Sequence, residues 1–131
     1  MTIVLPVTLC LAAAAALVNF WLGMRCGKQR HANGISVGDG SNEALIRAMR
    51  AQANFIEQAP ITIVLVAVVE LAGKGGMWLP WAAGIFIVGR ICHAFGMEGN
   101  FRAGRPIGML TAMLFQLALV VVAVLTVAGK M

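Results

Sequence analysis

Four long apolar stretches divide this chain of 131 residues, and they constrain its fold more than any other feature. They run from Ile3 to Met24, from Phe55 to Gly73, from Trp78 to Phe95 and from Ile107 to Gly129. Each is close to the ~20 residues that a helix needs to cross a bilayer. Since the connections are short, we expect one all-α integral membrane four-helix bundle over residues 1–131. The expected helices span about 3–24, 43–73, 77–97 and 106–129.

The composition supports a membrane protein. Hydrophobic residues make up 60% of the chain and charged residues 11%, whereas a typical soluble domain has about 25% charged residues. The first apolar stretch could also be a secretory signal peptide, with its alanine run at 12–16 as a cleavage region. Its first two residues carry no Lys or Arg, however, and its apolar run is longer than is usual in such peptides. We therefore favour a retained helix.

The basic residues are distributed unevenly along the chain. Those in or beside the first and third connections are Arg25, Lys28, Arg30, Arg47, Arg50, Arg90, Arg102 and Arg105. Only Lys74 and Lys130 fall on the other side. The positive-inside rule therefore predicts both termini outside, which for a bacterial inner membrane is the periplasm, and the first and third connections in the cytosol. The net charge of +5 mostly reflects this bias, so we expect membrane lipid and no nucleic acid as a partner.

A stripe of polar residues on the second expected helix is the first candidate site. At about 100° per residue, its members fall within about an 80° arc of one helix face. They are Glu43, Arg47, Arg50, Asn54 and Glu57. Ionisable side chains at membrane depth are costly unless they are paired, wetted or bound to something. Two interpretations stay open: Arg50 and Glu57 neutralise each other, or the stripe binds a ligand.

A second cluster lies on the third expected helix and in the connection after it. Arg90 and His93 are three residues apart and share a helix face, and Arg102 and Arg105 follow. Guanidinium groups bind carboxylates in bidentate fashion. Together with the stripe, they could hold a small zwitterion with more than one carboxylate, such as glutathione. Alternatively, Arg90 pairs with Glu57 to tie two helices together, and His93 is a hydrogen-bonded helix contact.

The cysteines and histidines form no recognisable chemical pattern of their own. Cys10, Cys26 and Cys92 form no C-x-x-C pair, and we interpret them as small, buried or reduced thiols. A catalytic thiol at Cys92, next to His93, has no further partner in the sequence. His31 and His93 have no companion Cys or His at metal-binding spacing, so we expect no metal.

The segment from Gly38 to Pro60 resembles the signature of the MAPEG family (membrane-associated proteins in eicosanoid and glutathione metabolism). The core pattern of that signature, R-A-x-x-N-x-x-E-x-x-P, is met by Arg50, Ala51, Asn54, Glu57 and Pro60. The segment from Arg90 to Gly96 is similar to the R-x-x-H segment of the third helix in bacterial members. The resemblance covers essentially the whole chain.

This resemblance implies a homotrimer that binds glutathione near the cytosolic side, in a cleft between neighbouring subunits. The expected glutathione-binding residues are Arg47, Arg50, Gln52, Asn54, Glu57, Arg90 and His93. Gln52 points about 160° away from Asn54, so it would reach the site of an adjacent subunit. In eicosanoid-synthesising relatives, an arginine at the start of the fourth helix is proposed to stabilise the glutathione thiolate. Arg105 is its nearest match here, and Arg102 is the alternative.

The expected function is a glutathione transferase that also reduces hydroperoxides, with glutathione as co-substrate. Its second substrate would be a hydrophobic electrophile or a lipid hydroperoxide that enters from the bilayer. The chain departs from the family at places where tyrosines are common: Gln58, Phe95 and Met97 stand there, and the chain has no Tyr. Any phenolic contact to glutathione is therefore missing, which weakens the expectation of catalysis more than that of the fold.

Two other functions fit parts of the sequence. One is a catalytically silent trimer that binds glutathione or lipid as a sensor or scaffold, which the missing tyrosines favour. The other is a small proton-coupled multidrug transporter, since the length and helix number agree. Such a transporter needs a carboxylate deep in a span. The first span offers only Asn19, and Glu57 and Glu70 lie toward the ends of the second helix.

Overall fold

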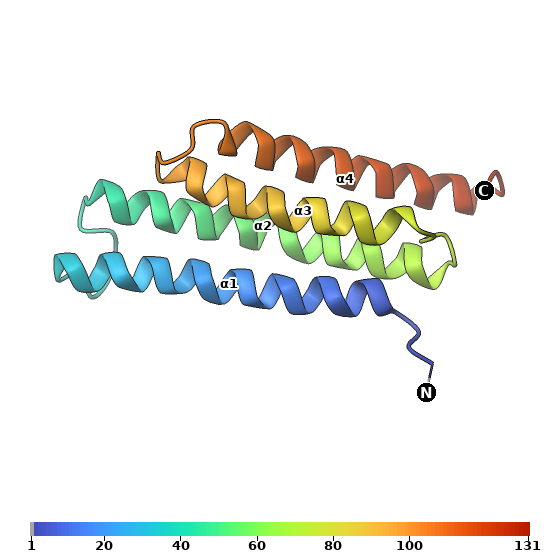
Figure 1. Cartoon of the computed structure of the whole chain (residues 1–131), viewed down its shortest axis with the longest axis horizontal. Helices are drawn as coiled ribbons and strands as arrows, with labels where there is room; N and C mark the ends of the chain where they lie inside the picture. Colours follow the sequence, from blue (N-terminus) through green and yellow to red (C-terminus); the bar gives the residue numbers. More distant parts are fainter. Residues whose placement is uncertain (1) are drawn as a thin grey trace.

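A computed structural model describes residues 2–131 and contains four helices and no strand within that range (Figure 1). Met1, which the expected single unit over residues 1–131 includes, lies outside the described residues. The helices are α1 (Pro6–Asn33), α2 (Glu43–Leu71), α3 (Trp78–Met97) and α4 (Gly104–Val127). All four are long and apolar enough to cross a membrane. The expected all-α membrane bundle is therefore confirmed.

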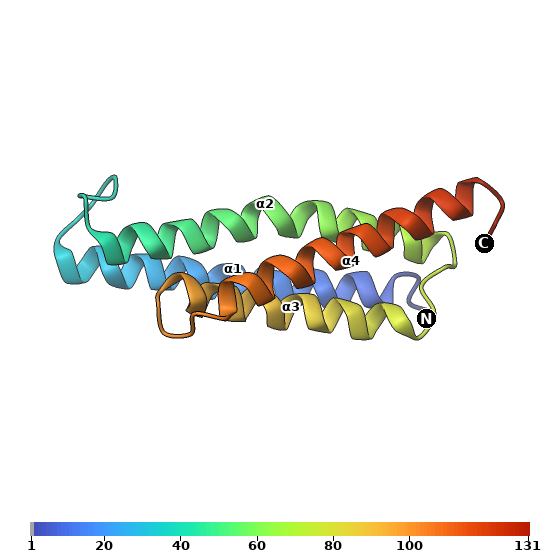
Figure 2. The ribbon, with the colours of Figure 1, turned by 90° about the horizontal axis from the view of Figure 1, so that it is seen from above.

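The helices alternate in direction, so the bundle has two chemically different ends (Figures 1 and 2). Both termini and the α2–α3 connection lie at one end, which we call the terminal end. The connections 34–42 and 98–103 lie at the other, which we call the loop end. α2 contacts all three other helices, whereas α1 and α4 do not touch within residues 2–131. α4 begins beside α3 and swings toward α2 at the terminal end (Figure 2).

α1 is longer than expected at the loop end. It was expected to end near residue 24, but it continues to Asn33 and stops at Gly34, which adopts a left-handed conformation with φ 64°. Glycine has no Cβ to clash there, and its N–H caps the carbonyls of Arg30 and His31. The added turns pack through the buried Cys26. The first connection is therefore 34–42, shorter than the expected 25–42.

α2 begins where the sequence indicates. The side chain of Asn42 accepts a hydrogen bond of 2.9 Å from the backbone N–H of Leu45, which satisfies one donor of the first turn. Glu43 follows in that turn, where a negative charge is favourable. The helix then runs without interruption through Pro60 to Leu71.

α3 and α4 pack closely at the loop end because glycines line their crossing. Gly89 and Gly96 of α3 face Gly104 and Gly108 of α4, and a side chain at Gly96 or Gly104 would run into the backbone of the other helix. Small residues allow helix backbones to approach in this way. α4 begins at Gly104, two residues before the expected start, because Pro106 then falls in the first turn, where its missing N–H costs nothing.

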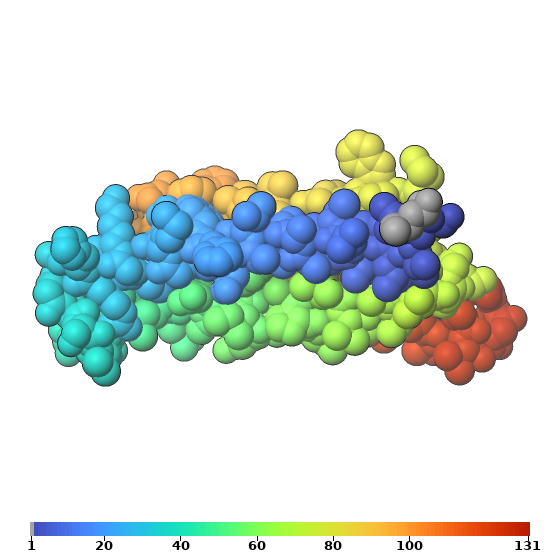
Figure 3. All heavy atoms as spheres, turned by 90° about the horizontal axis from the view of Figure 1, so that it is seen from below, coloured from blue at the N-terminus to red at the C-terminus, as the bar shows by residue number. Residues whose placement is uncertain are grey.

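The first turn of α1 is tied to α2 at the terminal end. The carboxylate of Glu70 accepts hydrogen bonds from the backbone N–H groups of Val7 (2.8 Å) and Thr8 (2.8 Å). It also accepts one from the hydroxyl of Thr8 (2.7 Å). These bonds satisfy donors that an isolated helix leaves free. α1 and α2 thus form one continuous face from end to end (Figure 3).

Candidate functional site

Arg90 of α3 joins the two polar clusters that the sequence suggests. Its side chain is 2% exposed. One terminal nitrogen donates to Oδ1 of Asn54 on α2, and the other donates to the carbonyl of Gly108 on α4. Both partners are neutral, and the buried Nε has no hydrogen-bond partner. The expected alternative, an Arg90–Glu57 ion pair, does not form within residues 2–131, so the buried positive charge is not neutralised by a carboxylate.

Asn54 and Arg90 line a groove of about 610 Å³ between α2 and α4. Farther along, the groove becomes apolar, with side chains such as Ile61, Leu65 and Leu117. A groove with polar groups at one end and an apolar extension can hold an amphipathic molecule beside a polar one.

Gln58 and Gln116 are hydrogen-bonded to each other and form a polar patch inside this groove, which we call the Gln58–Gln116 step. Nε2 of Gln116 donates to Oε1 of Gln58 (2.9 Å) and to the hydroxyl of Thr62 (2.9 Å). Gln58 and Gln116 both line the groove. The sequence did not assign them to a site, although a glutamine within an apolar span is a signal that could have done so.

Arg50 and Glu57 lie exposed on α2 and are not paired. The ion pairs within residues 2–131 are Arg25–Glu98 and Arg47–Glu43. The expected alternative that Arg50 and Glu57 neutralise each other is therefore wrong for the single chain. They are seven residues apart, so the two side chains leave the same face about two turns apart. Both charges are available to a ligand.

Arg47 is more engaged than the other members of the stripe. Its Nε and one Nη donate to the carboxylate of Glu43 at 3.1 and 2.6 Å. The other Nη donates to the backbone carbonyl of Met97 at 3.3 Å. Arg47 therefore links α2 to the last residue of α3.

The remaining expected residues of the second cluster differ in exposure. His93 is 4% exposed and packs against Gly108 of α4. Arg105 is the second residue of α4 and Arg102 precedes that helix; both are exposed and neither forms an ion pair within residues 2–131. Two unpaired guanidinium groups thus lie at the loop end, where α4 begins.

Gln52 lies on the other side of α2 from Asn54, as its position in the helix predicts. Its Oε1 accepts a hydrogen bond of 3.6 Å from Sγ of Cys26 on α1. It lines a separate groove of about 440 Å³ between α1 and α2, together with Arg30 and Gly23. Gln52 cannot serve the groove of its own subunit that contains Asn54.

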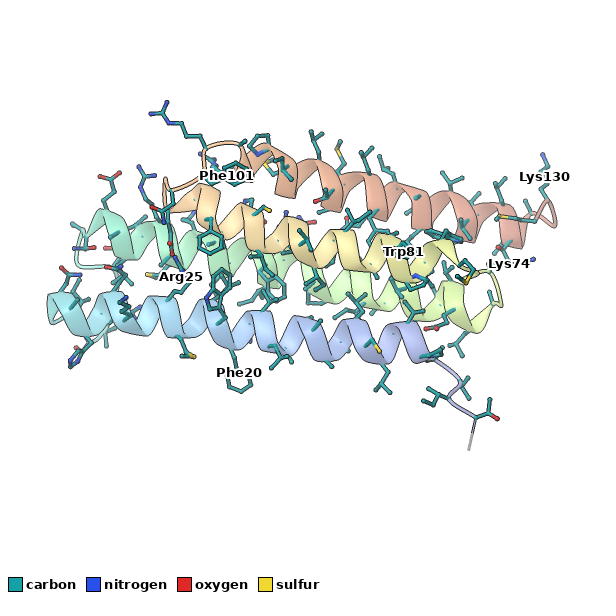
Figure 4. The ribbon with its side chains drawn as sticks, in the orientation of Figure 1. Phe20, Arg25, Lys74, Trp81, Phe101 and Lys130 are labelled. Carbon is teal, nitrogen blue, oxygen red and sulfur yellow. The ribbon has the colours of Figure 1, made fainter. Side chains whose placement is uncertain are left out.

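An ion pair that the sequence did not predict closes the loop end. Arg25 of α1 donates through Nε to Glu98 (2.6 Å) and through a second nitrogen to the other carboxylate oxygen. Its guanidinium also lies over the rings of Trp21 (4.8 Å) and Phe95 (5.1 Å). Figure 4 shows Arg25 reaching from α1 toward the α3–α4 connection. This contact fixes the connection that contains Arg102 and explains why Arg25 is not a free cation.

Comparison with known proteins places this arrangement in a family. The model of the MAPEG family matches residues 8–125, which is nearly the whole chain. No curated protein and no solved structure matches the chain.

Proposed function

This chain belongs to the MAPEG family, and from that premise we propose that it is a membrane-embedded glutathione transferase that also reduces lipid hydroperoxides. Family membership is consistent with glutathione-related transferase or peroxidase chemistry, or with lipid-mediator metabolism. Its four apolar helices make it an integral membrane protein. Glutathione is the proposed co-substrate, and a hydrophobic electrophile or a lipid hydroperoxide is the proposed second substrate.

The observation that carries this proposal is positive charge without carboxylate partners beside a groove. Arg90 is buried with neutral partners only. Arg50, Arg102 and Arg105 form no ion pair within residues 2–131. Arg90 is the buried member of this group, whereas the other three are exposed, and an isolated buried charge is unfavourable unless something compensates it. Glutathione has two carboxylates and one ammonium group, so it would neutralise several of these charges at once.

Each group of the proposed site has a counterpart on glutathione. The Arg50 guanidinium suits a carboxylate, and the Glu57 carboxylate suits the ammonium group. Asn54 offers both a donor and an acceptor, although Arg90 already occupies its Oδ1. In this arrangement Arg90 orients Asn54 and supplies positive potential, while His93 and Arg47 fix the surrounding helices.

The proposed mechanism is activation of the glutathione thiol. A free thiol has a pKa of about 8.5, so it is mostly protonated at neutral pH, and a nearby guanidinium lowers that pKa. Arg105 is our first choice for this guanidinium and Arg102 the alternative. The thiolate sulfur then bonds to an electrophilic carbon as the leaving group departs. With a hydroperoxide, two glutathione molecules are oxidised to the disulfide while the lipid alcohol and water form.

We place the site in a homotrimer, in a cleft between subunits at the cytosolic side of a bacterial inner membrane, with both termini in the periplasm. The separation of Asn54 and Gln52 onto two different grooves supports this arrangement. A neighbouring subunit could supply Gln52, which the subunit's own groove cannot use. The orientation follows from the cations at the loop end, whereas Lys74 and Lys130 lie at the terminal end (Figure 4).

The test is glutathione binding to purified protein in detergent or nanodiscs, measured by calorimetry. We expect binding to the wild-type protein and a loss of at least about tenfold in affinity for Arg50→Ala, since it removes a charge-assisted hydrogen bond. Lys28→Gln is the matched control, because it removes an exposed cation from the same end without touching the groove. No binding by the wild-type protein, or equal affinity for Arg50→Ala, contradicts the proposal.

The missing tyrosines favour a second candidate, a trimer that binds glutathione without turning it over. Gln58, Phe95 and Met97 stand where relatives often have tyrosine, and none of them can donate a phenolic hydrogen bond. Conjugation of glutathione to an aryl halide and reduction of a lipid hydroperoxide separate the two candidates. Binding without either reaction supports the silent trimer.

A further inference from the structure

Asn19 is a polar residue whose side chain has no hydrogen-bond partner within residues 2–131 of its own subunit. It lies near the middle of α1, a candidate membrane span, and it is exposed. It forms no side-chain hydrogen bond with any of residues 2–131. Its neighbour Phe20 is 72% exposed and points away from the bundle (Figure 4). A carboxamide turned toward hydrocarbon leaves its donor and acceptor unsatisfied, which is unfavourable.

The groove between α2 and α4 also contains polar atoms without hydrogen-bond partners within residues 2–131. The amide nitrogen of Gln116 donates to Gln58 and Thr62. This leaves Oε1 of Gln116 without a donor and Nε2 of Gln58 without an acceptor within residues 2–131, although both residues line the groove. One acceptor and one donor are what a second carboxamide would pair with.

The unpaired atoms of Asn19 and those of the groove lie at the same depth along the bundle. Thr8 on α1 is level with Glu70 on α2, and Cys26 is level with Gln52, because each pair is hydrogen-bonded. The two helices are antiparallel, and both contacts fix the same register. On that register Asn19 is level with Ala59, next to Gln58. A rotation about the membrane normal preserves depth, so a cyclic oligomer can bring the two levels together.

We propose that Asn19 of one subunit pairs with the Gln58–Gln116 step in the groove of the next subunit. This inference rests on the oligomer that the proposed function includes. The pairing is heterologous, since two different faces of the subunit meet, and such contacts form a ring when the rotation that relates the subunits closes, as it does in a trimer. It would give each groove a wall from the neighbouring α1. Ala16 and Gly23, about one turn before and after Asn19, are small enough to let that helix approach.

Disulfide cross-linking tests the contact directly. α1 and α4 do not touch within residues 2–131, so cysteines at positions 19 and 116 can join only different subunits. In a background with Cys10→Ala, Cys26→Ala and Cys92→Ala, we expect oxidised Asn19→Cys/Gln116→Cys protein to run as covalent dimers and trimers. Leu17→Cys/Gln116→Cys is the control, since residue 17 is turned about 200° from residue 19 on the helix.

A second measurement avoids the cysteine background. In an otherwise wild-type protein, Asn19→Leu removes the carboxamide and leaves an apolar side chain that is compatible with lipid. We expect the association constant of the oligomer in detergent, measured by native mass spectrometry, to fall about threefold to tenfold. If Asn19 faces lipid instead, Asn19→Leu leaves association unchanged or stronger, and that result overturns the contact.

These outcomes are distinct from those of the glutathione test. If the wild-type protein is oligomeric but the Asn19→Cys/Gln116→Cys variant does not cross-link, the contact is overturned, whether or not the protein binds glutathione. A monomeric wild-type protein overturns both the contact and the trimer. Failure of the wild-type protein to bind glutathione removes the proposed enzyme but leaves a cross-linked trimer standing.

Discussion

Glu70 and Glu57 are both acidic residues on α2, about three and a half helical turns apart, but their surroundings differ completely. Glu70, at the terminal end, accepts three hydrogen bonds from the first turn of α1. Glu57, at the midpoint of α2, is exposed and forms no ion pair within residues 2–131. The carboxylate of Glu70 is therefore bound within the subunit, whereas the carboxylate of Glu57 has no ion-pair partner within residues 2–131. The same contrast holds for the cations, since Arg25 is paired and Arg50 is not.

This difference separates the polar residues that are paired within the subunit from those that are left without a charged partner. A charge at membrane depth needs compensation, and for Glu70 the first turn of α1 supplies it. At the loop end the subunit compensates Arg25 and Arg47 with carboxylates and leaves the others uncompensated. Two of the uncompensated residues, Arg50 and Glu57, belong to the MAPEG signature on α2, which no argument from charge alone required.

The largest expected effect separates the two carboxylates by function. Glu57→Gln should weaken glutathione binding by about tenfold to a hundredfold, because in the proposed site it removes the charge that pairs with the ammonium group of glutathione. It should leave the free energy of unfolding unchanged. Calorimetry and denaturant titration in mixed micelles measure the two quantities. A loss of stability without a loss of affinity would place Glu57 with the structural residues.

The reciprocal change is Glu70→Gln. It keeps the shape but weakens the bonds to Val7 and Thr8, and we expect a loss of about 1–3 kcal/mol in unfolding free energy. Affinity for glutathione should not change, since the residue lies at the opposite end. Unchanged stability would show that the anchored turn of α1 is held by packing alone.

Arg25→Gln should have a smaller effect on stability. The Arg25–Glu98 pair is partly exposed, with 26% and 19% of the two side chains accessible, so solvent screens it. We expect a loss of about 1 kcal/mol, with the stacking on Trp21 and Phe95 included. Glu98→Gln should cost less, because the aromatic contacts of Arg25 remain. Equal losses would indicate that the ion pair, and not the stacking, holds the connection.

The smallest expected effect is that of Glu43→Gln. Glu43 and Arg47 form an i,i+4 pair on the surface, with 45% and 77% of the Arg47 and Glu43 side chains accessible. Such pairs stabilise a helix by about 0.3–0.5 kcal/mol. A denaturant titration at low and at high salt should show a difference that salt removes. A larger, salt-independent loss would mean that Arg47 is set in place by Glu43 for its contact with Met97.

The sequence predicts the local features well because their causes are local. Helical spans follow from hydrophobic length, the start of α2 from Asn42, and the stripe from its spacing. The end of α1 was missed because the polar residues after Met24 suggested a loop, although Gly34 is the stop signal that the helix uses. The partners of Arg90, Arg25 and Glu70 could not be predicted, because each contact joins helices that are distant in sequence.

The glycines where α3 crosses α4 have a consequence for genetic screens. Gly104 lies immediately before Arg105 and Gly108 three residues after it, so their loss would abolish function and resemble the loss of a reactive group. The cause would be steric, because a side chain at Gly104 meets the backbone of Cys92 and Gly96. In a saturation scan, only a parallel readout of protein abundance in the membrane distinguishes such positions from Arg105. A map of which substitutions this region tolerates therefore reports mainly on the close packing of α3 against α4, and only secondarily on catalytic residues.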